Sequence, residues 1–260
     1  GLTLSGGGSV QLIGSNSRLY GANSAVTLTN TNNKIHGYGQ LGANQLLFNN
    51  QSNVAADVSG QTLTVDASAT ITNTGLFKAE NGATLTLQNS TFENQTGGSI
   101  QSAASSKVFI SGLTLNSGHL TGTGTFRNTA GSAYSNLRID SGTTLDIDNN
   151  TSATLTGTLN NGGQIHLNTA GNFTNLIAGS GGSRLTGGGE IHLTTGIHNR
   201  IYGLNGTTTL TNTNNTIRGY GQLGVNQLKF VNQGTVTADT NGGILTIDTS
   251  SGLTNSGLLK

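Results

Sequence analysis

The sequence predicts an all-β protein folded as a parallel β-helix, or β-solenoid, with coils of about 20–26 residues. Three observations lead to this fold class. Short apolar–polar–apolar triplets follow one another along the whole chain, and glycine and asparagine separate them. A long internal repeat contains the same triplets in the same order. Alternation with a period of two indicates strands, and self-similarity at a fixed period is typical of a repeat architecture.

The internal repeat relates two stretches of the chain at a constant offset of 182. Residues 18–78 align without a gap with residues 200–260, and 37 of the 61 aligned positions are identical. The run GYGQLG at 37–42, for example, returns at 219–224. A repeat of this length indicates that the same stretch of architecture is built twice.

The repeat also extends upstream, and it predicts the domain organisation. LSGGGSVQL at 4–12 matches LTGGGEIHL at 185–193, there with an offset of 181. We therefore predict one continuous β-solenoid over residues 1–260, with a first copy at 1–182 and a partial second copy at 183–260. Because the second copy breaks off partway, we expect the chain to be a piece of a longer polypeptide.

The triplets are the main signal of strand structure. In each triplet a polar residue separates two apolar residues, which is the pattern of a short strand with one buried face. A helix needs an unbroken period of 3.6, and no segment of the sequence has one. In chain order, the triplets begin at Leu2, Val10, Val26, Leu46, Leu63, Leu85, Val108, Leu113, Leu145, Ile165, Ile191, Leu228 and Leu245.

Residues 43–59 lack glycine and are the best helix candidate, but the second copy favours a strand. Leu46 and Phe48 stay apolar in the second copy, whereas Leu47 between them becomes Lys229. A position that accepts lysine faces outward, so inward and outward positions alternate with a period of two. The stretch is therefore predicted to form strands.

The spacing of the strongest strands predicts the coil. They start at positions 63, 85 and 108 and again at 145, 165 and 191, so one coil takes about 20 to 26 residues. An asparagine followed by glycine and an apolar residue recurs in the same rhythm, as at Asn73 and Asn255. We expect three short strands per coil, with corners at glycine or asparagine, where a positive φ costs little.

The composition excludes several classes of protein. Apolar residues make up 32 % and charged residues 8 % of the chain, and the net charge is +1. A thin coil can fill its interior with few apolar residues, whereas an ordinary globule needs more. No cluster of lysine and arginine is present to bind nucleic acid. The absence of cysteine excludes disulfides and thiolate metal sites, and no apolar run is long enough for a membrane span.

The order of the motifs carries a resemblance to a known group of proteins. The second copy runs NTIRGYGQLGVN at 215–226, NQGTVTAD at 232–239, LTID at 245–248 and TNSGL at 254–258, and a GATLTL coil stands at 82–87. This order resembles the repeats of giant bacterial surface proteins of the filamentous-haemagglutinin and autotransporter-passenger type. The resemblance covers the whole chain as a likeness of repeat pattern. It implies a right-handed parallel β-helix, secretion, and a role in adhesion or surface coating.

The run GYGQLG also fits the glycine pattern of dinucleotide-binding proteins. That function requires a helix directly after the glycines and an acidic residue about 20 positions further on. Asp57 stands at a suitable distance from the run at 37–42, but the sequence after the glycines predicts a strand. We therefore interpret the glycines as a corner of the coil and expect no cofactor.

One acidic cluster is a candidate site. Asp140, Asp146 and Asp148 lie close together in the sequence and could hold a cation on an outer face, although a solvated face is the better explanation. Paired carboxylates are also the catalytic groups of polysaccharide-cleaving enzymes. Other aspartates recur in both copies, which favours a structural role for them, namely Asp57 with Asp239 and Asp66 with Asp248.

His166 and His192 share the setting Ile-His-Leu, which is a second candidate for paired ligands. The other copy argues against this function, because Gln11 stands at the position of His192 and Arg218 at that of His36. A ligand or general base would not be replaceable in this way. We interpret these histidines as outward-facing surface residues.

Together, these observations predict a structural protein without catalytic residues. We expect a segment of a long extracellular surface filament, stalk or adhesin from a bacterium. The expected partner is the protein itself, through end-to-end or repeat-to-repeat stacking, and surface glycans are a second partner. The alternative function is a carbohydrate-binding or polysaccharide-cleaving β-helix, with the acids at 140–148 as the place of cleavage.

Overall fold

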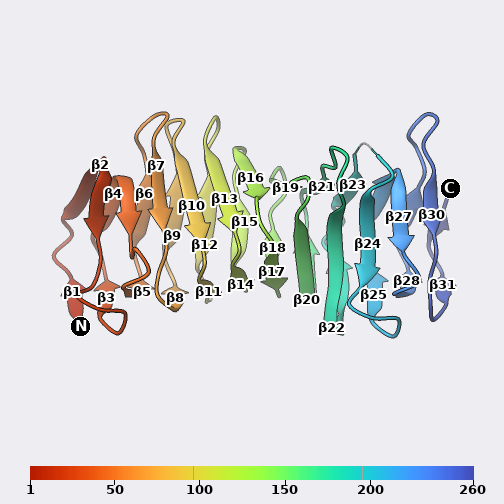
Figure 1. Ribbon diagram of the computed structural model, residues 1–260, viewed down its shortest axis with the longest axis horizontal. Helices are drawn as coiled ribbons and strands as arrows, with labels where there is room; N and C mark the ends of the chain where they lie inside the picture. Colours follow the sequence, from red (N-terminus) through yellow and green to blue (C-terminus); the bar gives the residue numbers. More distant parts are fainter. Residues whose placement is uncertain (96, 195) are drawn as a thin grey trace. The chain divides into compact units, whose positions relative to one another are not determined.

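The computed structural model describes residues 1–95, 97–194 and 196–260, and within these residues it contains strands and no helix. The strands pair in parallel and stack into about 11 turns, so the predicted β-solenoid is confirmed (Figure 1). The chain divides into two compact units, Gly1–Arg127 and Asn128–Lys260. This division does not coincide with the boundary between the two sequence copies, and the single continuous solenoid stays a prediction.

In the first unit the strands form three parallel stacks, and each coil contributes to all three. The first stack contains β1 (Leu2–Leu4), β3 (Thr27–Asn30), β5 (Leu47–Asn50), β8 (Thr70–Asn73), β11 (Thr91–Asn94) and β14 (Thr114–Asn116). The second contains β6 (Asn53–Ala56), β9 (Leu76–Ala79), β12 (Ser99–Ser102) and β15 (His119–Thr121). The third contains β7 (Thr62–Val65), β10 (Thr84–Gln88), β13 (Lys107–Ser111) and β16 (Thr125–Asn128). The longer strands β2 (Ser9–Leu19) and β4 (Lys34–Leu41) belong to the second and third stacks at once.

The second unit has three stacks of its own. The first contains β17 (Ser132–Ser135), β24 (Asn199–Gly203), β27 (Gly221–Gly224) and β30 (Leu245–Ile247). The second contains β18 (Arg138–Ile139), β25 (Thr209–Asn212), β28 (Lys229–Asn232) and β31 (Leu253–Asn255). The third contains β19 (Thr144–Ile147), β21 (Gln164–Leu167), β23 (Glu190–Leu193), β26 (Thr216–Gly219), β29 (Thr235–Thr237) and β32 (Leu258–Leu259). The long strands β20 (Ser152–Asn161) and β22 (Thr174–Thr186) join the first two stacks.

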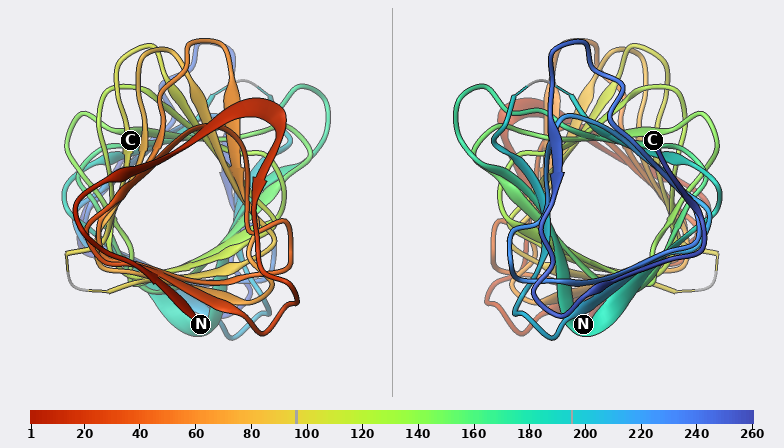
Figure 2. Two further views of the ribbon diagram at one scale, coloured as in Figure 1. Left: turned by 90° about the vertical axis from the view of Figure 1, so that its left-hand side faces the viewer. Right: turned by 90° about the vertical axis from the view of Figure 1, so that its right-hand side faces the viewer.

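The coils vary in length slightly more than the sequence predicted. In the first unit Lys34 pairs with Asn53, which is an offset of 19 along the chain. In the second unit Ser183 pairs with Leu210, which is an offset of 27. The strands themselves stay in register, so loops that project from the coils take up the difference (Figure 2).

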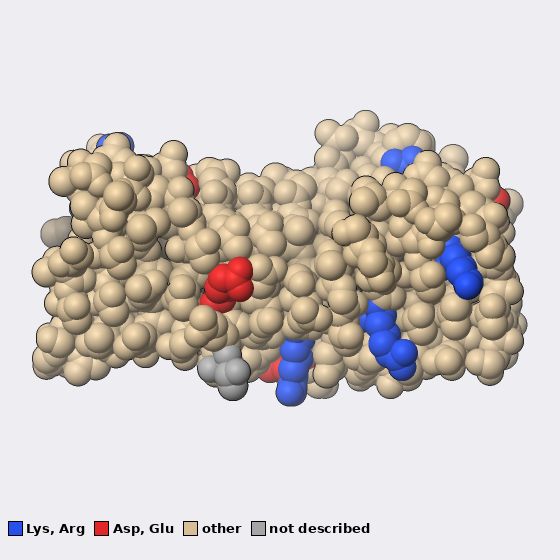
Figure 3. All heavy atoms as spheres, turned by 90° about the horizontal axis from the view of Figure 1, so that it is seen from below, with Lys and Arg blue, Asp and Glu red and all other residues tan. Residues whose placement is uncertain are grey.

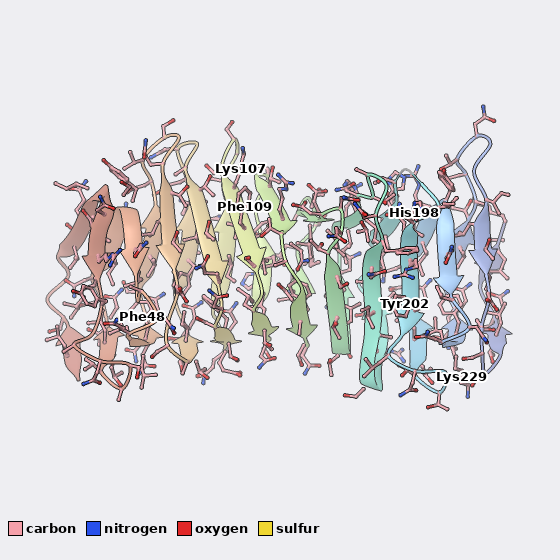
Figure 4. The ribbon with its side chains drawn as sticks, in the orientation of Figure 1. Phe48, Lys107, Phe109, His198, Tyr202 and Lys229 are labelled. Atoms are coloured by element: carbon pink, nitrogen blue, oxygen red, sulfur yellow. The ribbon has the colours of Figure 1, made fainter. Side chains whose placement is uncertain are left out.

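The core follows the predicted alternation of inward and outward residues. Phe48 on β5 is 1 % exposed, whereas its neighbour Leu47 is half-buried. At the equivalent of Leu47, the side chain of Lys229 on β28 is exposed (Figure 4). The inward ring of Phe77 packs edge-on against that of Phe48, with centroids 6.2 Å apart. Residues 43–59 therefore form strands, as the comparison of the two copies predicted.

The GYGQLG run forms a corner inside a strand. β4 pairs with β6 up to Gly37 and with β7 from Gly39 onward, so the chain changes stack between these two glycines. Both have a positive φ, 109° at Gly37 and 136° at Gly39. A Cβ at Gly37 would overlap the carbonyl oxygen of Leu12 on the preceding coil. The glycines are therefore explained by backbone geometry, and the corner interpretation is confirmed.

Buried asparagines form a ladder inside each unit. In the first unit, Asn30 donates its amide hydrogen to Asn50 (3.1 Å), Asn50 to Asn73 (2.9 Å) and Asn73 to Asn94 (2.7 Å). Positive φ at asparagine, as the sequence predicted, occurs for example at Asn81 (58°) and Asn89 (55°). Asn73 has a different role, because its φ is not positive and its side chain is fully buried. Such ladders satisfy buried amides along the axis of stacking.

Candidate functional site

Polar side chains with titratable groups line up on the outer face of the second unit. Asp146, His166, His192 and Arg218 occupy paired positions on β19, β21, β23 and β26. Neighbouring strands are about 4.8 Å apart, so each of these side chains lies beside the next one. We call these four residues the charged row.

The carboxylate of Asp146, the first residue of the charged row, has two side-chain neighbours within hydrogen-bond distance. Nδ1 of His166 lies 3.1 Å from Oδ1 of Asp146, and Asn168 donates its amide hydrogen to the same oxygen at 3.0 Å. The ring of His192 stands edge-on to that of His166, with centroids 5.7 Å apart. Both histidines face outward, as their setting in the sequence predicts, and the structure places them side by side.

The row ends in an ion pair. Arg218 donates from Nε to Oδ2 of Asp239 at 2.8 Å, and its Nη1 lies 3.4 Å from Oε1 of Glu190. The hydrogen bond to Asp239 raises the pKa of Arg218. Burial alone would raise the pKa of Asp239, but the hydrogen bond and charge of Arg218 outweigh it and lower that pKa. A general acid needs a raised pKa, so Asp239 is poorly suited to that role.

His192 differs from an ordinary surface histidine. Burial lowers its pKa first, and the positive charges of Arg218 and His166 lower it further, while Glu190 and Asp239 act in the opposite direction. The folded protein therefore favours the neutral imidazole at this position. This makes His192 a pH-sensitive element of the row.

The first unit has a related cluster. Asp57 Oδ2 lies 2.9 Å from Nζ of Lys34 and 2.9 Å from Nδ1 of His36. Burial would raise the pKa of Asp57, but the hydrogen bonds from Lys34 and His36 lower it overall. At the repeat offset of 182, His36 and Asp57 correspond to Arg218 and Asp239. A basic side chain paired with aspartate is thus retained although the residue type changes, which indicates a structural role.

A glycine-lined groove of about 460 Å³ lies beside the charged row. Its lining includes Gln164 and Glu190, which occupy paired positions at the start of β21 and β23. Two of its glycines are required by close packing. A Cβ at Gly163 would overlap the carbonyl oxygen of Thr143, and one at Gly189 would overlap that of Gly163. These glycines are therefore explained without a ligand.

Two of the three acids of the candidate cation site have different partners. Oδ1 of Asp140 lies 2.6 Å from Nε of Arg138, whereas Asp146 belongs to the charged row. The main-chain oxygen of Asp148 accepts a hydrogen bond from Oγ1 of Thr151. Within residues 1–95, 97–194 and 196–260, no three His, Cys, Asp or Glu side chains are grouped so that they could hold a metal ion. The geometry thus gives the candidate cation site no support.

Charged side chains are few and dispersed on the face drawn in Figure 3. The chain has 11 lysines and arginines against 10 aspartates and glutamates. Nucleic-acid binding depends on concentrated positive charge, so this surface is poorly suited to it. In the described part of the chain, no helix is long and apolar enough to cross a membrane.

Comparison of the chain with known protein families, with curated proteins and with solved structures finds no match.

Two features of the structure were missed in the sequence although the repeat contained their signal. Asn30, Asn50 and Asn73 recur at the offset of 182, and a pattern search could have singled them out as one buried ladder. The pairing of His36 with Asp57 could likewise have been inferred, because a basic residue and an aspartate recur together at positions 218 and 239. Neither follows from strand periodicity alone.

Proposed function

We propose that the chain is a structural segment of a long extracellular surface filament, stalk or adhesin, and that it acts through length and self-association without catalysis. The observation that carries this proposal is the recurrence of the same coil architecture in both sequence copies. The run at 37–42 and its counterpart at 219–224 both end a strand of one parallel stack and begin a strand of the next, and coils of this kind contact mainly their neighbours.

Two routes of elongation fit this architecture. Repetition within one polypeptide would extend the solenoid, or separate molecules would stack coil on coil through their strand edges. Both routes lengthen the rod at low cost, because each coil contacts mainly its neighbours. The ladders support this growth, since the bonds Asn30–Asn50 (3.1 Å) and Asn212–Asn232 (3.0 Å) are alike.

The proposed location is the bacterial cell surface or the extracellular space. The repeat order that resembles the filamentous-haemagglutinin and autotransporter-passenger repeats supports this location.

Electron microscopy of the native protein beside a denaturing gel tests the proposed function. We expect thin fibres. Very long polypeptides on the gel would indicate covalent repetition, and short ones would indicate end-to-end stacking. Discrete particles without fibres would contradict a filament function.

A further inference from the structure

A small polar pocket recurs at the same place in both sequence copies. In the first unit a pocket of about 240 Å³ is lined by Arg18, Gln40, Ala43, Thr64, Asp66 and Gln88. In the second unit a pocket of about 270 Å³ is lined by Gln222, Val225, Thr246 and Asp248. All four of these residues are counterparts, at an offset of 182, of residues that line the first pocket. The pocket is therefore a property of the repeat.

The pocket wall is the outer face of neighbouring strands. Arg18 on β2 pairs with Gln40 on β4, and Gln40 pairs with Thr64 on β7. In the second unit Gln222 on β27 pairs with Thr246 on β30 in the same way. Hydrogen-bonding side chains thus stand in one line on rigid strands, which is a suitable support for a binding site.

An unusual loop closes one side of each pocket. Gly42, Ala43 and Asn44 have positive φ values of 102°, 49° and 55° in succession. The counterpart of Ala43 is Val225, whose φ of 51° is strongly disfavoured for a β-branched residue. The N–H of Asn44 donates to the main-chain oxygen of Asp66 at 2.8 Å. This bond fixes the loop against the residue that directly follows β7. Strained backbone that is retained in this way is common at ligand sites.

The first pocket contains an acceptor without a donor. Oδ1 of Asp66 is buried and has no hydrogen-bond partner, while Oδ2 accepts a hydrogen bond from Nε2 of Gln88 at 3.2 Å. A buried oxygen of this kind is costly unless a ligand or water donates to it. Gln40 and Thr64 add both donors and acceptors to the wall. This combination of donors and acceptors can hydrogen-bond to two adjacent hydroxyl groups of a ligand.

The charges around the pockets narrow the ligand class. Arg18 lines the first pocket and disfavours a free cation beside Asp66. Its counterpart Arg200 does not line the second pocket but lies 3.6 Å from the ring centroid of Phe173. The residues that the pockets share are therefore two neutral hydrogen-bonding side chains and one aspartate, a set that fits a neutral ligand.

A tyrosine follows each of these arginines. Tyr20 and Tyr202 lie two positions after Arg18 and Arg200, which places them on the same side of an extended chain. Tyr20 is 53 % exposed, and Tyr202 lies on β24 (Figure 4). An aromatic ring with an apolar face and a polar hydroxyl suits the apolar face of a sugar ring.

We propose that each sequence copy binds one pyranose ring of a neutral glycan, through Gln40, Thr64 and Asp66 in the first unit and through Gln222, Thr246 and Asp248 in the second. The pockets are below the roughly 300 Å³ of typical drug-sized sites, so each holds a single ring. The first site binds more tightly, because Arg18 lines it, whereas the counterpart Arg200 lies against the ring of Phe173. Repetition of the unit repeats the site, so weak single contacts add up along a filament.

Saturation-transfer NMR with the whole chain tests this proposal. The probes are the methyl pyranosides of glucose, galactose, mannose and N-acetylglucosamine, each at millimolar concentration. We expect a transfer signal from at least one sugar. The double variant Asp66→Asn/Asp248→Asn should lower the affinity at least about tenfold, because it alters the acceptor in both pockets. Asp66→Asn alone should remove more of the signal than Asp248→Asn alone.

Two further variants separate binding from folding. Gln40→Ala/Gln222→Ala should reproduce the loss of signal. Gln101→Ala changes a glutamine on β12 that does not line the pocket and should leave the signal unchanged. Thermal unfolding of each variant confirms that it is folded. Absence of signal from all four sugars, a signal unchanged in both double variants, or stabilisation by calcium chloride alone would overturn the proposal.

Discussion

Asn73 shows how one buried amide holds two coils together. Its side chain accepts a hydrogen bond from Asn50, donates to Asn94 and to the main chain of Gly75, and also accepts from the N–H of Gly75. Each of these groups is buried or half-buried and would otherwise lack a partner. The ladder therefore specifies which asparagines face each other and contributes to the register of the stacked strands.

We expect Asn73→Ala to lower the free energy of unfolding by about 3 kcal/mol, because several buried polar groups lose their partner. The matched control is Asn255→Ala in the second copy, where the equivalent side chain is exposed. That variant should lose less than about 1 kcal/mol. Urea unfolding of both variants measures the difference. Equal losses at the two positions would show that burial of the ladder does not matter.

His192 should make the stability of the protein depend on pH. Its pKa in the folded state lies below the ordinary value of 6.5, so the unfolded chain binds the proton more readily. The stabilising contribution is complete above pH 6.5 and is lost as the pH falls towards the folded pKa. His192→Gln, which introduces the residue found at position 11, should remove this contribution. Urea unfolding at about pH 8 and about pH 5 compares the two proteins, and an unchanged pH dependence would contradict this assignment.

At the scale of the element, the strands could be predicted because inward positions such as Phe48 repeat with a period of two, and Lys229 marks an outward one. The stacking of strands could be predicted because the repeat requires a modular fold. The change of stack inside β4 could not be located to a residue, because it depends on the contact of Gly37 with the backbone of a neighbouring coil.

Gly219 is the counterpart of Gly37 and should be sensitive to substitution. Its φ is 105°, and a Cβ would overlap the carbonyl oxygen of Leu193. We expect Gly219→Ala to cost about 3 kcal/mol or more, because both the conformation and the contact are unfavourable. At the control position Gly131, a Cβ has no neighbour within 4 Å, so Gly131→Ala should change stability by less than about 0.5 kcal/mol. Thermal unfolding distinguishes the two, and a tolerated Gly219→Ala would contradict the corner geometry.

At the scale of the whole molecule, the sequence predicted the fold better than the site. Asp140 and Asp146 are near neighbours in the chain, but the structure pairs the first with Arg138 and the second with His166. The recurring pocket combines Gln40 and Asp66, which lie on separate coils, and sequence proximity cannot reveal such a set.

The most direct test of a solenoid filament is the axial spacing in cryo-electron micrographs or fibre diffraction of the native protein. Coils stacked along the filament predict a strong repeat at about 4.8 Å parallel to the filament axis, the distance between hydrogen-bonded strands. A filament in which this repeat is absent or lies across the axis would contradict the account.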